Sequence, residues 1–425
     1  AKDINYKTME DLLGAKQWID IDQFAERDFP ANPDIVQNDM NNPNKVIHKG
    51  DVFGYKYDIN IYHASAFVQN QWNFSQLDIY YAGKLTYTQF SRYGYMKNGR
   101  APEDSYGQGK VWWFVDPSLK TGATYKVNGR NRLSFNVLAE TRAPLSNDAF
   151  VSERVKNTLI PNLESRKILS YDLNYSFLFP VVRGRVSVFQ THMNGTTEKL
   201  GYYDDELQTF INHALTKSNK VYRGVEAGMS VKLNTHFTVS AAGTYADYRY
   251  TNNAVGIKSF ENGSSPDVTE VVLTKDLKIN SGPQLATNIT LDYFHQKMWF
   301  ADITLNYFDN NYLDFAPNRF TVSNMAKYTT PEALAALGTQ EKLQGGFILD
   351  ASIGKLIYLK NKKSLNFNLS LSNILNNTSM ITGGYQQARL PILNNALDMS
   401  NLDKFPNKYY YAWGFNLFLN IGYKF

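Results

Sequence analysis

The last seventeen residues of the chain, 409–425, carry an apolar or aromatic side chain at every odd position. They are Tyr409, Tyr411, Trp413, Phe415, Leu417, Leu419, Ile421, Tyr423 and Phe425, and most even positions are small or polar. A repeat of two is the period of a β-strand, in which successive side chains point to opposite faces. Such a strand reaches about 56 Å at ~3.3 Å per residue, and ~9–11 tilted residues already cross the hydrocarbon core of a bilayer. The pattern predicts one long strand with an apolar face.

The composition does not exclude a place in a membrane. Aromatic residues make up 14% of the 425 residues, and the mean hydropathy is −0.41. No run of eighteen apolar residues is present, so the sequence predicts no transmembrane helix. A transmembrane β-barrel hides its hydrophobicity in alternation, because polar residues facing the lumen dilute the apolar residues facing lipid.

Several functional classes are disfavoured. The chain has no cysteine, which removes disulfides, thiolate metal sites and cysteine nucleophiles. Its net charge of +5 is scattered, so we expect no nucleic-acid partner. The six histidines are dispersed, and the common catalytic, phosphate-binding and dinucleotide-binding motifs are absent. We therefore expect no enzyme activity, no metal site and no cofactor.

Alternating segments recur along the chain, joined in turn by one short and one long connection. The predicted short turns lie at residues 71–73, 128–129, 180, 234–236, 295–297 and 360–363, and the long connections span 91–111, 143–165, 194–217, 251–281, 309–344 and 375–407. Short turns on one rim and long loops on the other are typical of an outer-membrane barrel, with the turns in the periplasm. The predicted fold class is an all-β, transmembrane antiparallel β-barrel with about thirteen recognisable strands.

The predicted number of strands, about thirteen, is odd. Bacterial single-chain barrels have an even number of strands, and an open edge in lipid would leave backbone groups unpaired. We therefore expect the last part of a larger barrel, with residues 1–50 as an extracellular loop segment containing a short helix capped by Thr8, and residues 51–425 as the barrel. An unrecognised strand within residues 1–50, giving a complete barrel of fourteen, is the alternative.

A resemblance to a known family rests on several short motifs between Gly50 and Phe425. They are Arg142-Ala143-Pro144, Tyr222-Arg223-Gly224-Val225-Glu226, Ser372-Asn373-Ile374-Leu375-Asn376-Asn377, the stretch from Thr382 to Arg389, and Phe405-Pro406-Asn407-Lys408-Tyr409. In this order and spacing they resemble the C-terminal barrel portion of TonB-dependent outer-membrane receptors of the Bacteroidota type, in the branch with a carboxypeptidase-regulatory-like domain and a plug. The terminal Phe425 resembles the assembly signal of such barrels.

The resemblance implies a twenty-two-stranded barrel in the bacterial outer membrane that takes up a scarce nutrient, such as a siderophore, glycan, peptide or cofactor. It also implies the partners: outer-membrane lipid, a plug domain and upstream strands not found in this sequence, the TonB energy-coupling complex acting through the plug, and a surface lipoprotein lid. Two other functions stay open: a passive porin-like channel complete in itself, and a soluble β-rich adhesin or carbohydrate-binding module.

Candidate ligand-binding residues fall in the long connections. Trp112 and Trp113, with Tyr95 nearby, form an aromatic platform in one interpretation and anchor the outer leaflet in the other. Tyr385, Gln387 and Arg389 offer a ring and hydrogen-bond donors for an anionic or glycosidic oxygen, and a salt bridge between loops is the simpler account of Arg389.

Overall fold

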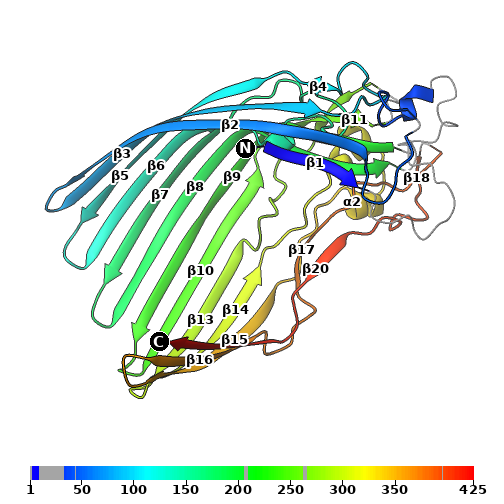
Figure 1. The fold of residues 1–425 in the computed structure, drawn as a ribbon. Helices are drawn as coiled ribbons and strands as arrows, with labels where there is room; N and C mark the ends of the chain where they lie inside the picture. Colours follow the sequence, from blue (N-terminus) through cyan, green and yellow to red (C-terminus); the bar gives the residue numbers. More distant parts are fainter. Residues whose placement is uncertain (1, 9–32, 44, 205–208, 262–265, 395) are drawn as a thin grey trace.

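The computed structural model describes residues 2–8, 33–43, 45–204, 209–261, 266–394 and 396–425. Its main feature is an antiparallel sheet curved into a trough, with short turns at one end and a cap of hairpins, loops and short helices at the other (Figure 1). In order of hydrogen bonding, the wall runs β1–β2–β3–β5–β6–β7–β8–β9–β10–β13–β14–β15–β16–β21. The predicted all-β, antiparallel barrel fold is confirmed.

The wall strands are β1 (Lys2–Thr8), β2 (Val52–Asn73), β3 (Leu77–Gly94), β5 (Trp112–Lys126), β6 (Asn131–Arg142), β7 (Arg166–Leu178), β8 (Val182–Asp204), β9 (Thr209–Lys232), β10 (Phe237–Tyr250), β13 (Leu285–Phe294), β14 (Trp299–Asp309), β15 (Gly346–Tyr358), β16 (Ser364–Ser372) and β21 (Asn416–Lys424). The cap contains β4 (Gly107–Gln108), β11 (Ala254–Phe260), β12 (Val268–Val272), β17 (Ile381–Tyr385), β18 (Ile392–Leu393), β19 (Ala396–Leu397) and β20 (Lys408–Tyr411). The helical elements are η2 (Pro33–Val36), η3 (Ser146–Asp148), η4 (Pro317–Phe320), α1 (Val322–Met325) and α2 (Pro331–Leu337). Among the described residues, no helix is both long and apolar enough to span a bilayer.

The two faces of the wall differ as the alternation predicts. Cross-strand partners share a face, so Ile289 on β13 lies level with Leu305 on β14, and both are exposed on the convex side. Their chain neighbours Asn288 and Asn306 are also partners and line the concave side. The apolar rows therefore face outward and the polar rows inward, which is the arrangement that a lipid environment requires.

The wall has two open edges. β1 pairs only with the part of β2 from Val52 to Asn60, and no described residue of β21 pairs with β1 or β2. Residues 2–8 thus form a strand where a loop is expected, and they supply a fourteenth strand without closing the sheet. The helix expected just after Thr8 falls within 9–32, outside the described residues.

Two predicted loops are instead hairpins. β8 runs on to Asp204 and β9 begins at Thr209, while β11 pairs with the outer part of β9 and β12 pairs with β11. We call this four-stranded extension, residues 196–204, 209–216, 254–260 and 268–272, the blade. Bulges at Gly195 and Lys217, both with positive φ, shift the inward-facing positions between the wall and the blade, from odd to even numbers on β8 and from even to odd numbers on β9. The shift breaks the period of two, which is why the sequence pattern does not show these strands.

The final strand is not continuous. β20 pairs with β17 in the cap, whereas β21 pairs with β16 in the wall. Asn373 Nδ2 donates a hydrogen bond to the Trp413 carbonyl (2.8 Å), and the Phe415 N–H donates to Asn376 Oδ1 (2.9 Å). The prediction of one seventeen-residue strand is therefore wrong, because side chains of the Asn-Ile-Leu-Asn-Asn motif bind the backbone where the ladder would continue.

Short-range signals in the sequence set the ends of several other elements. α2 begins after Thr330, whose hydroxyl accepts a hydrogen bond from the Ala333 N–H, and it ends at Gly338, so its two ends carry a Thr-Pro start signal and a Gly stop signal. The turn after β2 lies at residues 74–76 rather than at the expected 71–73. In the Arg-Ala-Pro motif, the Ala143 N–H donates to the buried Asp116 carboxylate (2.9 Å), so this motif ends β6.

An arginine at Ile289 should destabilise the folded barrel, because this side chain is 58% exposed on the outward face in the middle of β13. We expect a loss of about 2–4 kcal/mol, the range for a cation near the bilayer midplane. The loss of stability is measured by folding the protein into lipid vesicles and reading the folded fraction from heat-modifiable migration on a gel. Thr290→Arg, one residue along and facing inward, is the matched control and should cost much less. Equal losses would contradict the assignment of faces.

Candidate functional site

The first predicted site is the aromatic platform of Trp112, Trp113 and Tyr95. Trp112 and Trp113 are neighbours on β5 and therefore point to opposite faces. Trp112 packs against the cluster of Tyr57 and Phe90 on the inner face, with Lys110 Nζ 4.3 Å from the centre of its ring. Trp113 is 64% exposed on the outward face. The structure does not bring the two indoles into one platform.

Tyr95, the third member of that group, follows the end of β3. Its hydroxyl donates to Asp58 Oδ2 (2.5 Å), a nearly buried carboxylate that also pairs with Lys2 Nζ (2.7 Å). In this structure Tyr95 therefore joins the end of β3 to Asp58 of β2, and the same carboxylate joins β2 to Lys2 of β1.

The second predicted group gathers in the cap. Tyr385 lies across from Tyr410 with ring centres 6.3 Å apart, Gln387 Nε2 donates to the Pro406 carbonyl (2.8 Å), and the Arg389 guanidinium lies 4.2 Å from the ring centre of Phe405. These three residues thus hold segment 385–389 against segment 405–410.

A residue that the sequence did not single out holds this region together. The buried guanidinium of Arg319 in η4 donates to the carbonyls of Gln387 (2.6 Å) and Phe405 (2.9 Å), and its own carbonyl accepts from the Tyr328 hydroxyl (3.1 Å). A charged group in a buried site needs such partners, because desolvation is costly. Arg319 sits in a connection without periodicity, so no pattern marks it.

These segments enclose a cavity of about 290 Å³ that we call the loop pocket. It lies between the inner face of the blade and the segments around α1, and the predicted residue Arg389 lines it. The other lining residues are Tyr202, Asp204, Ile211, Lys258, Phe260, Val268, Glu270, Asn318, Ser323, Asn324, Lys327, Leu390, Ile392, Lys404 and Phe405. Aromatic and aliphatic side chains with a few charged groups are typical of small-molecule sites.

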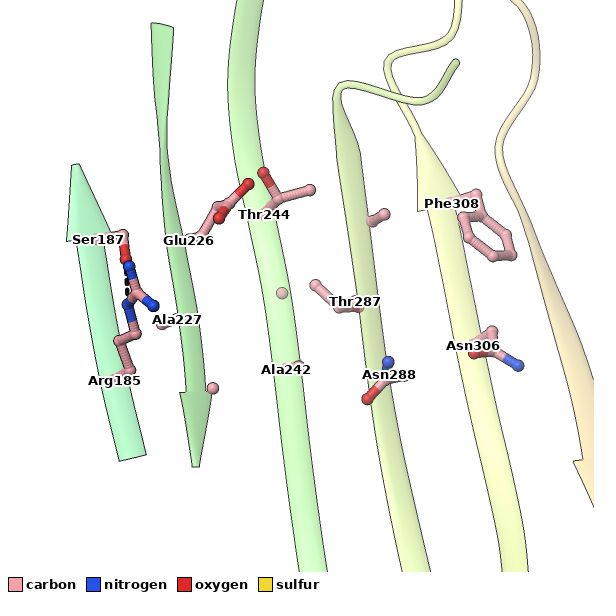
Figure 2. Close-up of a pocket in the computed structure, with 13 residues that line it drawn as sticks. Arg185, Ser187, Glu226, Ala227, Ala242, Thr244, Thr287, Asn288, Asn306 and Phe308 are labelled. Atoms are coloured by element: carbon pink, nitrogen blue, oxygen red, sulfur yellow. Dashed lines mark hydrogen bonds between the residues drawn. The ribbon is translucent and has the colours of Figure 1, made fainter. Parts of the chain in front are cut away.

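The inner wall below the cap carries a second, larger hollow of about 520 Å³, the wall recess (Figure 2). Two inward rows cross it: Arg185–Gly228–Ala242–Asn288–Asn306, and Ser187–Glu226–Thr244–Ala286–Phe308. Small residues in the middle of both rows make the hollow, and Arg185 and Glu226 flank it on one side. Gly224, just above, allows close strand contact, since a Cβ there would lie 2.8 Å from the Tyr245 carbonyl oxygen.

A chain of polar side chains leads across the wall to this recess. The Tyr80 hydroxyl donates to Asn136 Oδ1 (2.9 Å), Asn136 Nδ2 donates to Asp172 Oδ1 (2.8 Å), and the Ser187 hydroxyl donates to Asn174 Oδ1 (2.6 Å). The inner surface is thus hydrophilic over at least four strands, as an aqueous lumen requires.

His213 is a buried imidazole in the blade. Neither ring nitrogen has a hydrogen-bond partner among the described residues. Burial, with Lys258 nearby, lowers the pKa of His213 to about 3. It also lines a cavity of about 270 Å³ with Glu198, Lys220 and Asp314. Burial and the Glu198 carboxylate raise the pKa of Asp314. Within the described part of the chain, no three His, Asp or Glu side chains are grouped to hold a metal ion.

Comparison with known proteins gives a likeness in structure only. No family model and no curated protein sequence matches the chain. Among solved structures, the ferric-catecholate import receptor Fiu from Escherichia coli K12 superimposes with a TM-score of 0.53 at 13% identity, over 89% of this chain and 47% of Fiu. The copper transporter OprC gives 0.56 at 14% identity, over 89% and 50%. The siderophore receptor PiuA from Acinetobacter baumannii gives 0.56 at 11% identity, over 89% and 46%.

The fold is that of the barrel in these receptors. The chain spans about half the length of each solved structure that it matches. At identities this low the likeness establishes the fold and leaves ligand and activity to be argued from the residues.

Replacing Arg319 with methionine should loosen the cap without unfolding the wall, because buried carbonyls at Gln387 and Phe405 lose a charged donor. We expect faster hydrogen exchange and proteolysis in residues 386–407, with β13–β16 unchanged. Lys404→Met, which removes an exposed cation from the same segment, is the control. Equal protection in both variants would show that Arg319 does not hold these segments.

The cap should lose stability as the pH falls from about 6.5 towards 3. In this interval the unfolded imidazole binds a proton and the buried His213, with a pKa of about 3, does not, so acid favours opening by up to about 1.4 kcal/mol per pH unit. Hydrogen exchange of the blade amides at pH 7.5 and pH 5, corrected for intrinsic rates, measures this. His213→Leu should flatten the dependence on pH; an unchanged slope would exclude His213 as its source.

Proposed function

We propose that this chain is the barrel part of a TonB-dependent receptor in the bacterial outer membrane, which takes up a scarce nutrient by energy-coupled transport. The observation that carries the proposal is a receptor-type barrel wall with apolar outward rows and polar inward rows, whose mouth is filled by a structured cap. The structural likeness to Fiu, OprC and PiuA supports it. The chemistry is binding and passage, with no bond made or broken.

The partners follow from the two open edges and from the share of the receptors that the chain covers. Upstream strands would complete a twenty-two-stranded barrel, and a plug would fill the lumen and connect to the TonB complex. The finer assignment to the Bacteroidota-type branch, and with it a surface lipoprotein, rests on the sequence motifs. Two of these, around Ala143 and Asn373, have structural roles at strand ends.

For the ligand, we propose capture in the cap and release along the inner wall. The loop pocket offers aromatic rings and cations that include Arg389, and the wall recess lies further along the same face of β9. Fiu is named as a ferric-catecholate import receptor, PiuA as a siderophore receptor and OprC as a copper transporter. A siderophore leads the candidate nutrients, ahead of a glycan, a peptide or a cofactor.

The two other functions differ in what they require. A passive porin needs a closed, open-mouthed channel, whereas here the cap fills the mouth and the described strands do not close. A soluble adhesin needs its exposed apolar rows covered, and Leu305, Ile289 and Tyr245 are exposed together on the convex face.

Uptake in cells separates these possibilities. Deleting the gene for the complete polypeptide should impair growth on one limiting nutrient, and abolishing the proton-motive force or TonB should have the same effect. The purified protein in planar bilayers should show no steady conductance. Large passive conductance, or uptake independent of proton-motive force, would contradict the importer. Full solubility without detergent would contradict the barrel.

A further inference from the structure

On the outward face of β7–β10, a row of apolar side chains is followed directly by a row of polar and charged side chains. Leu173, Val188, Val225 and Tyr245 form one outward row, and the next row towards the cap is Tyr171, Gln190, Arg223 and Asp247. Rows on one face are two residues apart, or roughly 7 Å along the strand. The apolar surface therefore gives way to a charged surface over a very short distance.

This change lies at the expected outer boundary of the membrane. From Phe237 beside the short turn to Tyr245, the outward positions of β10 are apolar or glycine. Eight residue steps at ~3.4 Å, tilted by about 40°, rise about 21 Å, close to the ~25 Å apolar band of such barrels. Asp247 and Arg249, next on the same face, are thus at the level of the outer-leaflet headgroups.

Three cations meet one carboxylate there. Arg223 Nη2 lies 2.9 Å and Arg249 Nε 3.3 Å from Asp247 Oδ2, and Lys278 Nζ lies 2.6 Å from Oδ1. Asp276, 3.4 Å from Arg249 Nη1, adds a second carboxylate. We call these five residues the rim cluster; its charge is three positive against two negative. The Arg223 side chain is 47% exposed, and its Nε and Nη2 both donate to Asp247 Oδ2.

We propose that the rim cluster binds the phosphate group of an outer-leaflet lipid headgroup. Guanidinium groups bind phosphate through paired hydrogen bonds, and clusters of Lys and Arg beside the apolar zone recognise anionic lipids. The neighbouring apolar row, Tyr245, Val225 and Val188, offers the acyl chains of the same lipid a surface. This inference rests on the proposed function in one respect, namely that the convex face lies in the outer membrane.

A purely structural ion-pair network makes a different prediction. In such a network Asp247 is the common partner of all three cations, so its loss should weaken the barrel and leave lipid binding unchanged. In a phosphate site Asp247 competes with the ligand. Its removal then raises the net charge of the rim cluster and strengthens lipid binding, whereas removal of a cation weakens it.

The test uses the complete polypeptide purified in a neutral detergent. Native mass spectrometry would measure binding of diphosphorylated lipid A and of the same lipid after dephosphorylation, with inorganic phosphate as a third probe. For the phosphorylated lipid we expect Arg223→Gln with Lys278→Gln to lower affinity about tenfold and Asp247→Asn to raise it a few-fold. The dephosphorylated lipid should bind weakly to every variant.

Lys355→Gln is the matched control. Lys355 is also outward-facing, with Nζ 4.5 Å from the ring centre of Trp299, but it lies near the short turns at the opposite boundary. It should leave affinity unchanged. Equal binding of both lipids, an unchanged affinity in the cation variants, or a loss with Asp247→Asn would overturn the lipid site. Inorganic phosphate binding as tightly as the lipid would overturn the headgroup assignment. A protein that stays soluble without detergent would instead overturn the proposed function itself.

Discussion

Backbone hydrogen bonding in a medium without water is the constraint on which the rest of this structure depends. Each unpaired N–H or C=O in hydrocarbon costs several kcal/mol, so strands can lie in lipid only within a continuous ladder. The described wall meets this condition from β2 to β16. On the edge of β2 that faces away from β3, along residues 61–73, and on the outer edge of β21, no described residue provides a partner. This physical cost, more than any likeness, is the reason to propose further strands at both edges.

The same constraint separates the functions of the two faces. Because neighbouring residues on a strand point in opposite directions, one stretch of sequence carries both a lipid surface and a lumen surface. β9 illustrates this: Val225 and Arg223 belong to the membrane face and the rim cluster, whereas Glu226 and Gly228 line the wall recess. Trp112 and Trp113 are adjacent on β5 and therefore face opposite sides of the wall, so the two side chains do not form one binding surface.

The cap follows different rules, because its backbone need not be paired with neighbouring wall strands. Arg319 joins segments nearly seventy and more than eighty residues away in sequence, and Asn373 joins two strand ends forty residues apart. Single buried polar side chains carry these connections by satisfying carbonyl groups that no ladder reaches. Bulges at Gly195 and Lys217 let the ladder continue from the wall into the blade with its faces shifted, so that His213 and Leu215 point to the inside of the cap.

By itself the sequence determined what is local and periodic. The strands of the wall, their faces, most of the short turns and the ends of α2 could be predicted because alternation and capping depend on neighbouring residues. The tertiary structure alone decided the break before β21, the blade, the strand at residues 2–8 and the cavities, because each depends on register shifts or contacts distant in sequence. For the candidate site, the sequence grouped Tyr385, Gln387 and Arg389 because they are close along the chain, and the structure places all three in the cap against residues 405–410. It could not show that Arg319 holds them or that Asp247 gathers three cations, because such convergence exists only once the strands are paired.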